Sequence, residues 1–293
     1  MAGQKPELTE KGGRLNAGSP PLHSAPRGVS QPCGLPHFPK FRRWRLRMSA
    51  ALLSGLLLAG MLISASGGSV RSMENTMENR PLKAEDTLQD MLEHPALRSF
   101  AKHLLPRPED AHALCTLGTV GRLMPWHHAV QPDDVVASLN RLIRDVNAGK
   151  PVFYSFYDEG PLRENTGPFF LRGKPGAPFA LICPGGGFVY VGTFHEGLPL
   201  AEVINARGYN AFVLQYRTGG EETPSADMAA AVSWIFRSAG ELGVGTDGWS
   251  VWGGSAGARM AADMGTYGSA ALGGDPLPRP SAVIMAYTSH SRY

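Results

Sequence analysis

The sequence predicts an α/β fold, with a mostly parallel sheet that carries helices on both faces and follows a helical N-terminal segment. Residues 179–183, 210–216 and 249–252 are apolar runs without the in–out alternation of a strand that has one wet face. Segments with helical spacing separate these runs, and this order is typical of a covered parallel sheet. Glycine and proline bound the runs and mark the turns.

The N-terminal part of this fold is expected to be helical. Residues 82–105 have apolar side chains at helical spacing, and Pro95 interrupts them, which disfavours one continuous helix. A clearer helix begins at Pro132, where two aspartates follow in the first turn, and it ends at Gly149. We expect this segment to pack against the residues that follow it.

The pattern of apolar residues changes after residue 150. Residues 152–157 and 168–173 are short aromatic and β-branched runs separated by turn residues, and they predict an antiparallel pair. Helices are expected around residues 199–206 and over residues 225–239, and a last strand over residues 281–287.

The first part of the chain is not expected to belong to the folded domain. Residues 1–47 are rich in proline, glycine and serine and are either a disordered extension or the result of a start codon placed too early. Their basic end runs into the apolar residues 48–65, which predict a secretory signal, an uncleaved anchor or, third, a buried core helix. The first two place the folded part outside the cytoplasm, secreted, periplasmic or anchored. The expected divisions are 1–47, the signal or anchor 48–67, the helical segment 68–150 and a partial α/β domain 151–293.

Composition excludes some functions. The 293 residues are 43% apolar with 36 glycines and 24 prolines, as in a turn-rich globular protein. Residues 1–47 hold nine basic and two acidic residues, so the +3 net charge conceals a mildly acidic remainder with no basic stripe for nucleic acid. Cys115 and Cys183 could form a bridge in an oxidising compartment, but an inert core thiol is the better interpretation for Cys183. No spacing resembles a metal site, and no cofactor is expected.

The stretch VWGGSAGARMAADMG places Ser255 directly between a predicted strand and a predicted helix. It fits G-x-S-x-G, the nucleophile elbow, in which a sharp turn presents the serine hydroxyl above the sheet. Gly253 and Gly257 would relieve the crowding of that turn, and the Ala256 N–H would face a negative oxygen formed nearby. The alternative is that the small residues only let the helix pack closely.

A second glycine-rich loop, Pro184–Phe188, follows the strand at 179–183. Its three glycines let the backbone approach a ligand and direct N–H groups toward it, as in an oxyanion hole. A phosphate loop is a weaker interpretation, because neither Lys-Ser/Thr nor G-x-G-x-x-G is present. A plain turn is the remaining alternative.

Together these segments resemble the α/β-hydrolase superfamily, in particular its bacterial esterase and lipase branch with acetyl-esterase-like and feruloyl-esterase-like enzymes. The resemblance implies that Ser255 is the nucleophile. It also implies that Gly185, Gly186 and Ala256 donate backbone N–H groups to the oxyanion. Where many relatives have a histidine before the glycines, this chain has Pro184. The motifs that carry the resemblance are PGGGF (184–188), HEGLPLA (195–201), GYNAFVLQYR (208–217), DMAAAVSWI (227–235) and GGSAGARMA (253–261).

Other polar residues carry weaker predictions. The pair His195 and Glu196 is no zinc motif, because a proline stands where the second histidine would be, and we read it as a loop or helix-start feature near the rim of the site. Arg217 either pairs with Asp227, which is the favoured interpretation, or lines the pocket. Residues 127–128 are histidines of a loop that is solvated by default.

The remaining members of a catalytic triad are hard to find. In this fold the order is Ser, then Asp or Glu, then His, and downstream of Ser255 stand only Asp263, Asp275 and His290. Asp263 falls inside the helix after the elbow, and Asp275 falls at the amino edge of the sheet, so His290 is the one candidate base. The resemblance places the acid and the histidine beyond Tyr293. We therefore expect a C-terminally truncated hydrolase with an impaired site, in which the last strand is an unpaired edge of the sheet.

The sequence thus predicts a serine carboxylic-ester hydrolase that forms an acyl-Ser255 intermediate on a small or sugar-borne ester. Two alternatives stay open: a non-catalytic relative or gene relic with a binding role, and a serine peptidase of the same fold. The expected partner is a small-molecule ester, with the membrane as a second partner if residues 48–65 remain attached. Nothing in the sequence indicates an oligomeric state.

Overall fold

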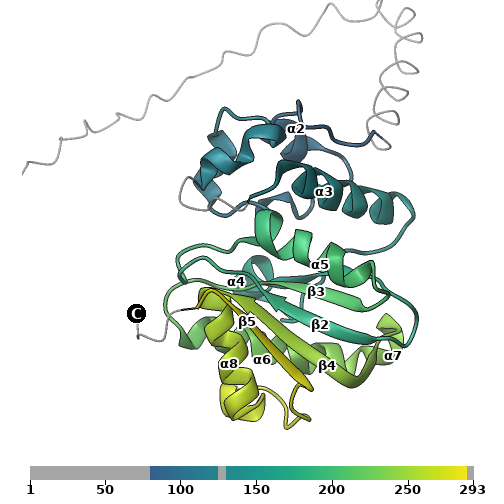
Figure 1. The fold of residues 1–293 in the computed structure, drawn as a ribbon, viewed down its shortest axis with the longest axis vertical. Coiled ribbons are helices and arrows are strands. Elements are labelled where there is room, and N and C mark those ends of the chain that lie inside the picture. Colours follow the sequence, from purple (N-terminus) through teal and green to yellow (C-terminus); the bar gives the residue numbers. More distant parts are fainter. Residues whose placement is uncertain (1–79, 125–129, 289–293) are drawn as a thin grey trace, which may run out of the picture. The chain divides into compact units, whose positions relative to one another are not determined.

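The structure is a computed structural model, and it describes residues 80–124 and 130–288 (Figure 1). Short helical turns lie at Ala101–His103, Pro108–His112, Leu117–Leu123, Thr193–Gly197 and Ala270–Leu272. The helices are α2 (Leu88–Glu93), α3 (Pro132–Asn147), α4 (Gly160–Asn165), α5 (Leu198–Asn205), α6 (Glu222–Arg237), α7 (Ala239–Leu242) and α8 (Ala256–Tyr267). The strands are β1 (Gly167–Leu171), β2 (Pro178–Cys183), β3 (Asn210–Gln215), β4 (Gly245–Gly254) and β5 (Ala282–Ala286).

The five strands form one mixed sheet in the order β1-β3-β2-β4-β5. Only β1 runs antiparallel to its neighbour, and the other three pairings are parallel. In the centre, Leu181 of β2 stands opposite Phe212 of β3 and Val251 of β4. This arrangement confirms the fold class that the sequence predicts.

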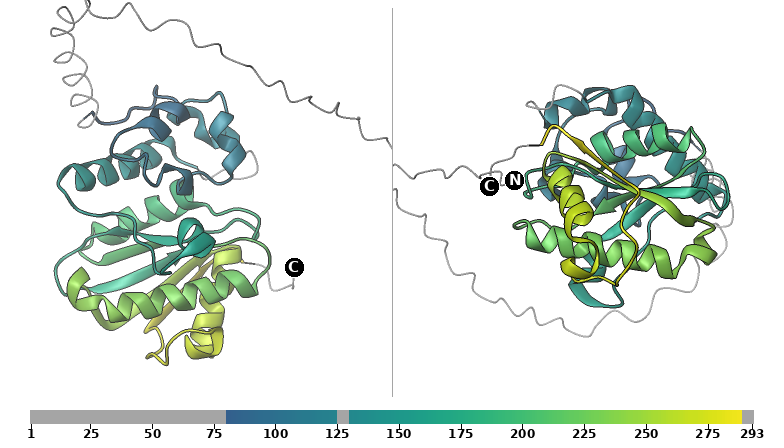
Figure 2. Two further views of the ribbon diagram at one scale, coloured as in Figure 1. Left: turned by 180° about the vertical axis from the view of Figure 1, so that it is seen from behind. Right: turned by 60° about the horizontal axis from the view of Figure 1, so that its bottom comes forward.

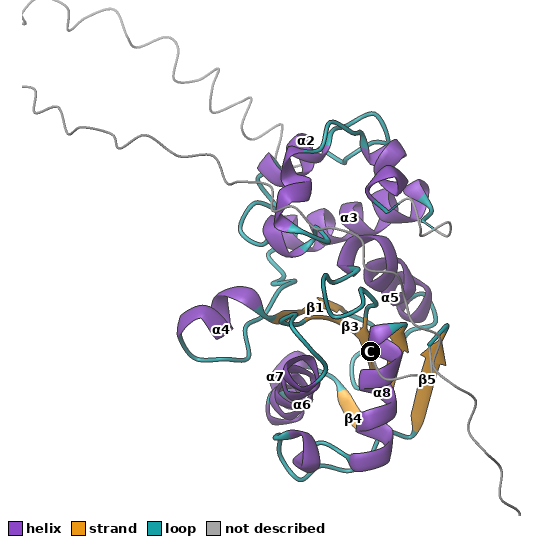
Figure 3. Cartoon of the chain, turned by 90° about the vertical axis from the view of Figure 1, so that its left-hand side faces the viewer, coloured by secondary structure: helices purple, strands orange, loops and turns teal. Residues whose placement is uncertain are grey.

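Strands β1, β2 and β3 bury both of their faces, which explains why they are continuous apolar runs, whereas most of the edge strand β5 is exposed. Along β2, Ala180 and Ile182 belong to one hydrophobic core, whereas Phe179 and Leu181 belong to the other. The first core contains α2, α3 and α5, and the second contains α6 and α8. Figures 1 and 3 show α3 and α5 on one side of the sheet and α6, α7 and α8 on the other, and the further views of Figure 2 show the same layers.

The antiparallel pair expected from residues 152–157 and 168–173 is only partly present. The first run makes a single bridge, Phe153 opposite Phe169, while β1 pairs along its length with β3. Beyond this bridge the first run contacts α6, where the Tyr157 hydroxyl donates to the Asp227 carboxylate at 2.7 Å. Contacts outside the sheet thus accompany the loss of the expected strand.

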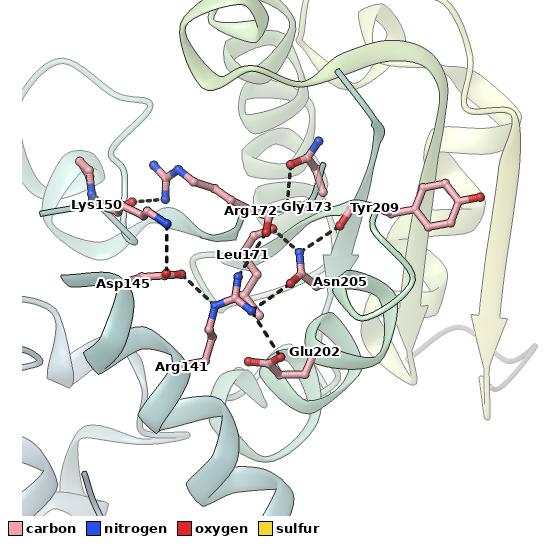
Figure 4. Close-up of polar contacts among 11 residues, drawn as sticks. Arg141, Asp145, Lys150, Leu171, Arg172, Gly173, Glu202, Asn205 and Tyr209 are labelled. Carbon is pink, nitrogen blue, oxygen red and sulfur yellow. Dashed lines mark hydrogen bonds and ion pairs between the residues drawn. The ribbon is translucent and has the colours of Figure 1, made fainter. Parts of the chain in front are cut away.

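Helix α2 ends just before Pro95, as the interruption of the apolar pattern predicts, and α3 begins at Pro132. Arg141 of α3 joins this segment to the sheet (Figure 4). Its guanidinium donates to Asp145 at 3.0 Å, to Asn205 of α5 at 3.1 Å and to the Arg172 carbonyl after β1 at 3.2 Å. Asn205 in turn donates to the carbonyls of Leu171 and Tyr209. The polar network fixes α3 over the sheet where the first core ends.

The expectations for residues 1–79 and 289–293 lie outside the described residues, so the signal or anchor at 48–65 stays a prediction. No helix within the described part of the chain is long and apolar enough to cross a membrane. Cys115 and Cys183 are free thiols, and burial raises the pKa of Cys183 well above its usual value. The interpretation of Cys183 as an inert core thiol is therefore supported.

We expect Arg141→Ala to lower the free energy of unfolding by about 2 kcal/mol, because hydrogen bonds to charged groups contribute roughly 1.5–3 kcal/mol. Urea denaturation followed by tryptophan fluorescence measures the change. The matched control is Arg144→Ala on the same helix, an exposed position that should change stability by less than about 0.5 kcal/mol. Equal losses in the two variants would contradict the linking role of Arg141.

Candidate active site

Ser255 occupies a strained turn between β4 and α8. Its backbone angles are φ 49° and ψ −116°, a conformation that residues with a side chain rarely adopt. Because β4 lies between the parallel strands β2 and β5, this turn emerges at the carboxyl edge of the sheet. The Ser255 side chain is half-buried there. The geometry is that of the nucleophile elbow.

The glycines that flank Ser255 are required by close backbone contacts. A methyl group at Gly253 would overlap with the backbone of Gly257 and Ala258. A methyl group at Gly257 would overlap with the carbonyl group of Cys183, the last residue of β2. The structure therefore gives both positions the steric reason that the sequence analysis expects.

The glycine loop after β2 lies against the elbow. A Cβ atom at Gly185 would stand 3.1 Å from the Ser255 Cβ and 3.1 Å from the Gly254 carbonyl oxygen. Gly186 has φ 145°, and a side chain there would overlap with the Tyr190 backbone. The structure thus brings together Ser255, Ala256 and the glycine loop, which stand about 70 residues apart in the sequence.

The N–H groups near Ser255 differ from the expected set in one respect. Among the described residues, the N–H groups of Gly186 and Ala256 have no hydrogen-bond acceptor. In contrast, the Gly185 N–H donates to Glu196 Oε1 at 2.9 Å. Since this N–H already has an acceptor, the donor role expected of Gly185 is revised, and Gly186 and Ala256 remain as candidate donors.

The sequence analysis placed Glu196 near the rim of the site without a role there, and it missed Tyr287. Glu196 lies in the turn before α5, and the Tyr287 hydroxyl, just after β5, donates to its Oε2 at 2.6 Å. Burial first, and then the Glu196 carboxylate, raise the pKa of Tyr287 well above its usual value. A side chain at Gly254 would collide with both groups. The elbow itself does not require a glycine at position 254. This second glycine was therefore the signal in the sequence that other groups pack against the end of β4.

The acids and histidines considered for the triad do not meet at Ser255 in the described structure. Asp263 lies on α8 near Ser225 of α6 and near Glu221, the residue before α6, and burial raises its pKa. Asp275 binds Arg237 at 2.5 Å before β5, at the amino edge of the sheet. His290 and the histidines 127–128 fall outside the described residues, so their roles stay predictions. Within residues 80–124 and 130–288, the Ser255 hydroxyl has no hydrogen-bond partner.

The expected pairing of Arg217 with Asp227 is confirmed. The guanidinium binds both carboxylate oxygens at 2.6–3.1 Å, and the Arg217 N–H donates to Oδ2 at 2.9 Å. Asp227 is fully buried and also accepts the Tyr157 hydroxyl, so burial and this carboxylate raise the pKa of Tyr157 to about 12. The pair fixes the chain as it leaves β3 for α6.

A cavity of about 650 Å³ begins just after the glycine loop in the chain, and Ser255 is not among the residues that line it. It is lined by residues 189–191, which follow the loop, by residues 215–218 at the carboxyl end of β3 and by parts of residues 102–111 of the N-terminal segment. His103 lies on its wall, stacked on Phe153 at 4.7 Å, and burial followed by the Lys102 charge lowers its pKa to about 4. Its imidazole is therefore neutral near pH 7.

A mostly parallel sheet, a strained serine elbow after a central strand and a glycine loop against it are the features of the α/β-hydrolase fold. No family model and no curated protein matches the chain. Among solved structures, it is similar to MGS-M1, an α/β-hydrolase enzyme from a Medee basin deep-sea metagenome library, with 26% identity and a TM-score of 0.41. That match covers 48% of this chain and 57% of the other.

Esterase 2 of Thermogutta terrifontis is a second similar structure. Its form phosphonylated by cyclosarin is 21% identical with a TM-score of 0.39, over 46% of this chain and 55% of that one. Its form phosphorylated by paraoxon gives the same identity and TM-score over 46% and 56%. The chain thus spans little more than half the length of the solved structures that it resembles.

We expect Gly257→Ala to lower the free energy of unfolding by about 3 kcal/mol, because overpacked positions cost roughly 1–3 kcal/mol or more and backbone atoms cannot move aside. The matched control is Gly240→Ala in α7, where nothing lies within 4 Å of the added methyl. This control should keep or raise stability by up to about 1 kcal/mol. If both variants unfolded at the same urea concentration as the wild type, the close contact between Gly257 and the Cys183 carbonyl would be absent.

Proposed function

We propose that the protein is a serine carboxylic-ester hydrolase in which the Ser255 hydroxyl attacks the ester carbonyl and forms an acyl-serine intermediate. The observation that carries the proposal is the strained Ser255 at the carboxyl edge of the sheet, next to two N–H groups without an acceptor. A residue held at φ 49° is costly, and such strain concentrates at functional sites. Close packing of α8 alone does not require a strained serine.

The attack places a negative charge on the former carbonyl oxygen. The N–H groups of Gly186 and Ala256 are the donors that would stabilise it, and one such donor contributes about 10²–10³ in kcat. The serine proton passes to a base, and His290 stays the sequence-based candidate for that role. Collapse of the tetrahedral intermediate expels the alcohol, and water then releases the acid.

The cavity after the glycine loop supports an ester with both a polar and an apolar part. Its polar lining residues include His103, whose imidazole is neutral, Gln215 and Arg217, which its buried partner Asp227 holds in place. Its apolar lining residues include Leu105 and Val191. A small or sugar-borne ester has polar and apolar parts of this kind.

Prolonged incubation with a fluorophosphonate should attach one phosphonyl group to Ser255, because the reagent traps a nucleophilic serine at the elbow. Intact-mass and peptide mass spectrometry measure the extent and the position of labelling. Ser255→Ala should abolish the label, whereas Ser281→Ala, at an exposed serine before β5, should keep it. Labelling of a residue other than Ser255, or no labelling after complete incubation, would contradict the proposal.

Turnover of p-nitrophenyl acetate and of a matching anilide separates ester from amide hydrolysis in the same sample. We expect ester cleavage that Ser255→Ala lowers to the residual rate of about 10³–10⁴-fold over water that a site without its nucleophile retains. An ester rate that is the same in Ser255→Ala would contradict the hydrolase proposal. Amide cleavage without ester cleavage would favour the peptidase instead.

A further inference from the structure

We propose that Glu196 is a positioning residue for the oxyanion loop: its carboxylate ties Gly185 to Tyr287 and so holds the next N–H, that of Gly186, beside Ser255. The inference rests on the proposed function for its catalytic meaning, and on geometry alone for the contact itself. It concerns a residue that the sequence analysis places only at the rim of the site.

The two oxygens of Glu196 serve two different strand ends. Oε1 accepts the Gly185 N–H of the loop after β2 at 2.9 Å, and Oε2 accepts the Tyr287 hydroxyl after β5 at 2.6 Å. The carboxylate also fills the space that a side chain at Gly254, the last residue of β4, would take. One half-buried carboxylate therefore contacts the carboxyl ends of three neighbouring strands.

The contact fixes the loop on both sides of Gly185. While its N–H is bound to Glu196, its carbonyl accepts the Gly192 N–H at 2.9 Å. The carbonyl of Gly186 accepts the N–H groups of Val189 and Tyr190 at 3.0 and 3.1 Å. These bonds leave the Gly186 N–H as the polar group of that residue with no acceptor in the described structure.

A carboxylate is suited to this task because both of its oxygens accept hydrogen bonds. Charge-assisted hydrogen bonds are roughly twice as strong as neutral ones. A glutamine has one acceptor oxygen and would keep the Gly185 contact in weakened form. Glu196 makes no hydrogen bond with Ser255 in the described structure, so the geometry favours a role through the loop over a role as the base.

The Gly185 amide can be observed selectively, because Pro175–Gly176 and Pro184–Gly185 are the two Pro–Gly pairs of the sequence. A protein with carbonyl-¹³C proline and ¹⁵N glycine should therefore give two HNCO peaks. We expect Glu196→Ala to move the Gly185 proton upfield and to speed its exchange with water, because its acceptor is lost. The Gly176 peak, whose N–H donates to the Gly243 carbonyl at 2.8 Å, should stay in place as the internal control.

Three further variants test how the shift of the Gly185 peak depends on the hydrogen bonds of Glu196. Glu196→Gln should give a smaller shift than Glu196→Ala, and Tyr287→Phe should also give a small shift, since it frees one oxygen of the carboxylate. Glu241→Gln, at an exposed carboxylate of α7, should change neither peak. An unchanged Gly185 peak in Glu196→Ala would overturn the proposal. Movement of both peaks together would overturn it too, because Glu196 would then act on the whole fold.

The rate of fluorophosphonate labelling gives the catalytic readout. We expect Glu196→Ala to slow labelling of Ser255 about tenfold to hundredfold, less than the 10²–10³ that loss of an oxyanion donor costs, with most of the rate restored in Glu196→Gln. An equal rate in Glu196→Ala would overturn the positioning role. If the wild type is never labelled, the proposed function is contradicted. The Gly185 peak then still shows whether Glu196 holds the loop.

Discussion

The candidate site depends on the backbones at the ends of β2 and β4 approaching more closely than any side chain would allow. The turn at Ser255 brings Gly257 against the carbonyl of Cys183, and it brings the elbow within van der Waals contact of Gly185. A contact between backbones has no flexible atoms that could adjust to an added methyl group. The positions of the serine and of the N–H donors therefore follow from the same packing constraint.

Polar side chains then fix the loops that leave this edge of the sheet. Asp227 holds the chain after β3, and Glu196 joins the chain after β2 to the chain after β5. The Tyr216 hydroxyl adds a bond of 2.7 Å to the Pro184 carbonyl, just before the glycines. Oxyanion donors are effective when they are oriented before the reaction, so rigid loops of this kind suit acyl transfer.

The N-terminal segment is a structural part of the fold and contributes to the cavity. Its apolar side chains belong to the same core as one face of the sheet, and Arg141 ties α3 to α5 and to the end of β1. Side chains from residues 102–111 also line the cavity, together with residues 189–191 and 215–218. The N-terminal segment therefore contributes to this cavity as well as to the core.

The sequence alone determined the features that depend on local pattern. Uninterrupted apolar runs predicted strands buried on both faces, and G-x-S-x-G after a strand predicted the strained turn at Ser255. The pairing of Arg217 with Asp227 could be predicted from the sequence, because both residues flank one connection between a strand and a helix.

Only the tertiary structure decided which distant groups share the carboxyl edge of the sheet. Glu196 and Tyr287 stand 91 positions apart, and they meet because strand order places β2, β4 and β5 side by side. No local pattern encodes that order, so the sequence could not show that the Gly185 N–H is already bound. The same limit applies to residues 152–157, whose strand-like composition could not show that they make one bridge to β1 and that Tyr157 contacts Asp227 of α6.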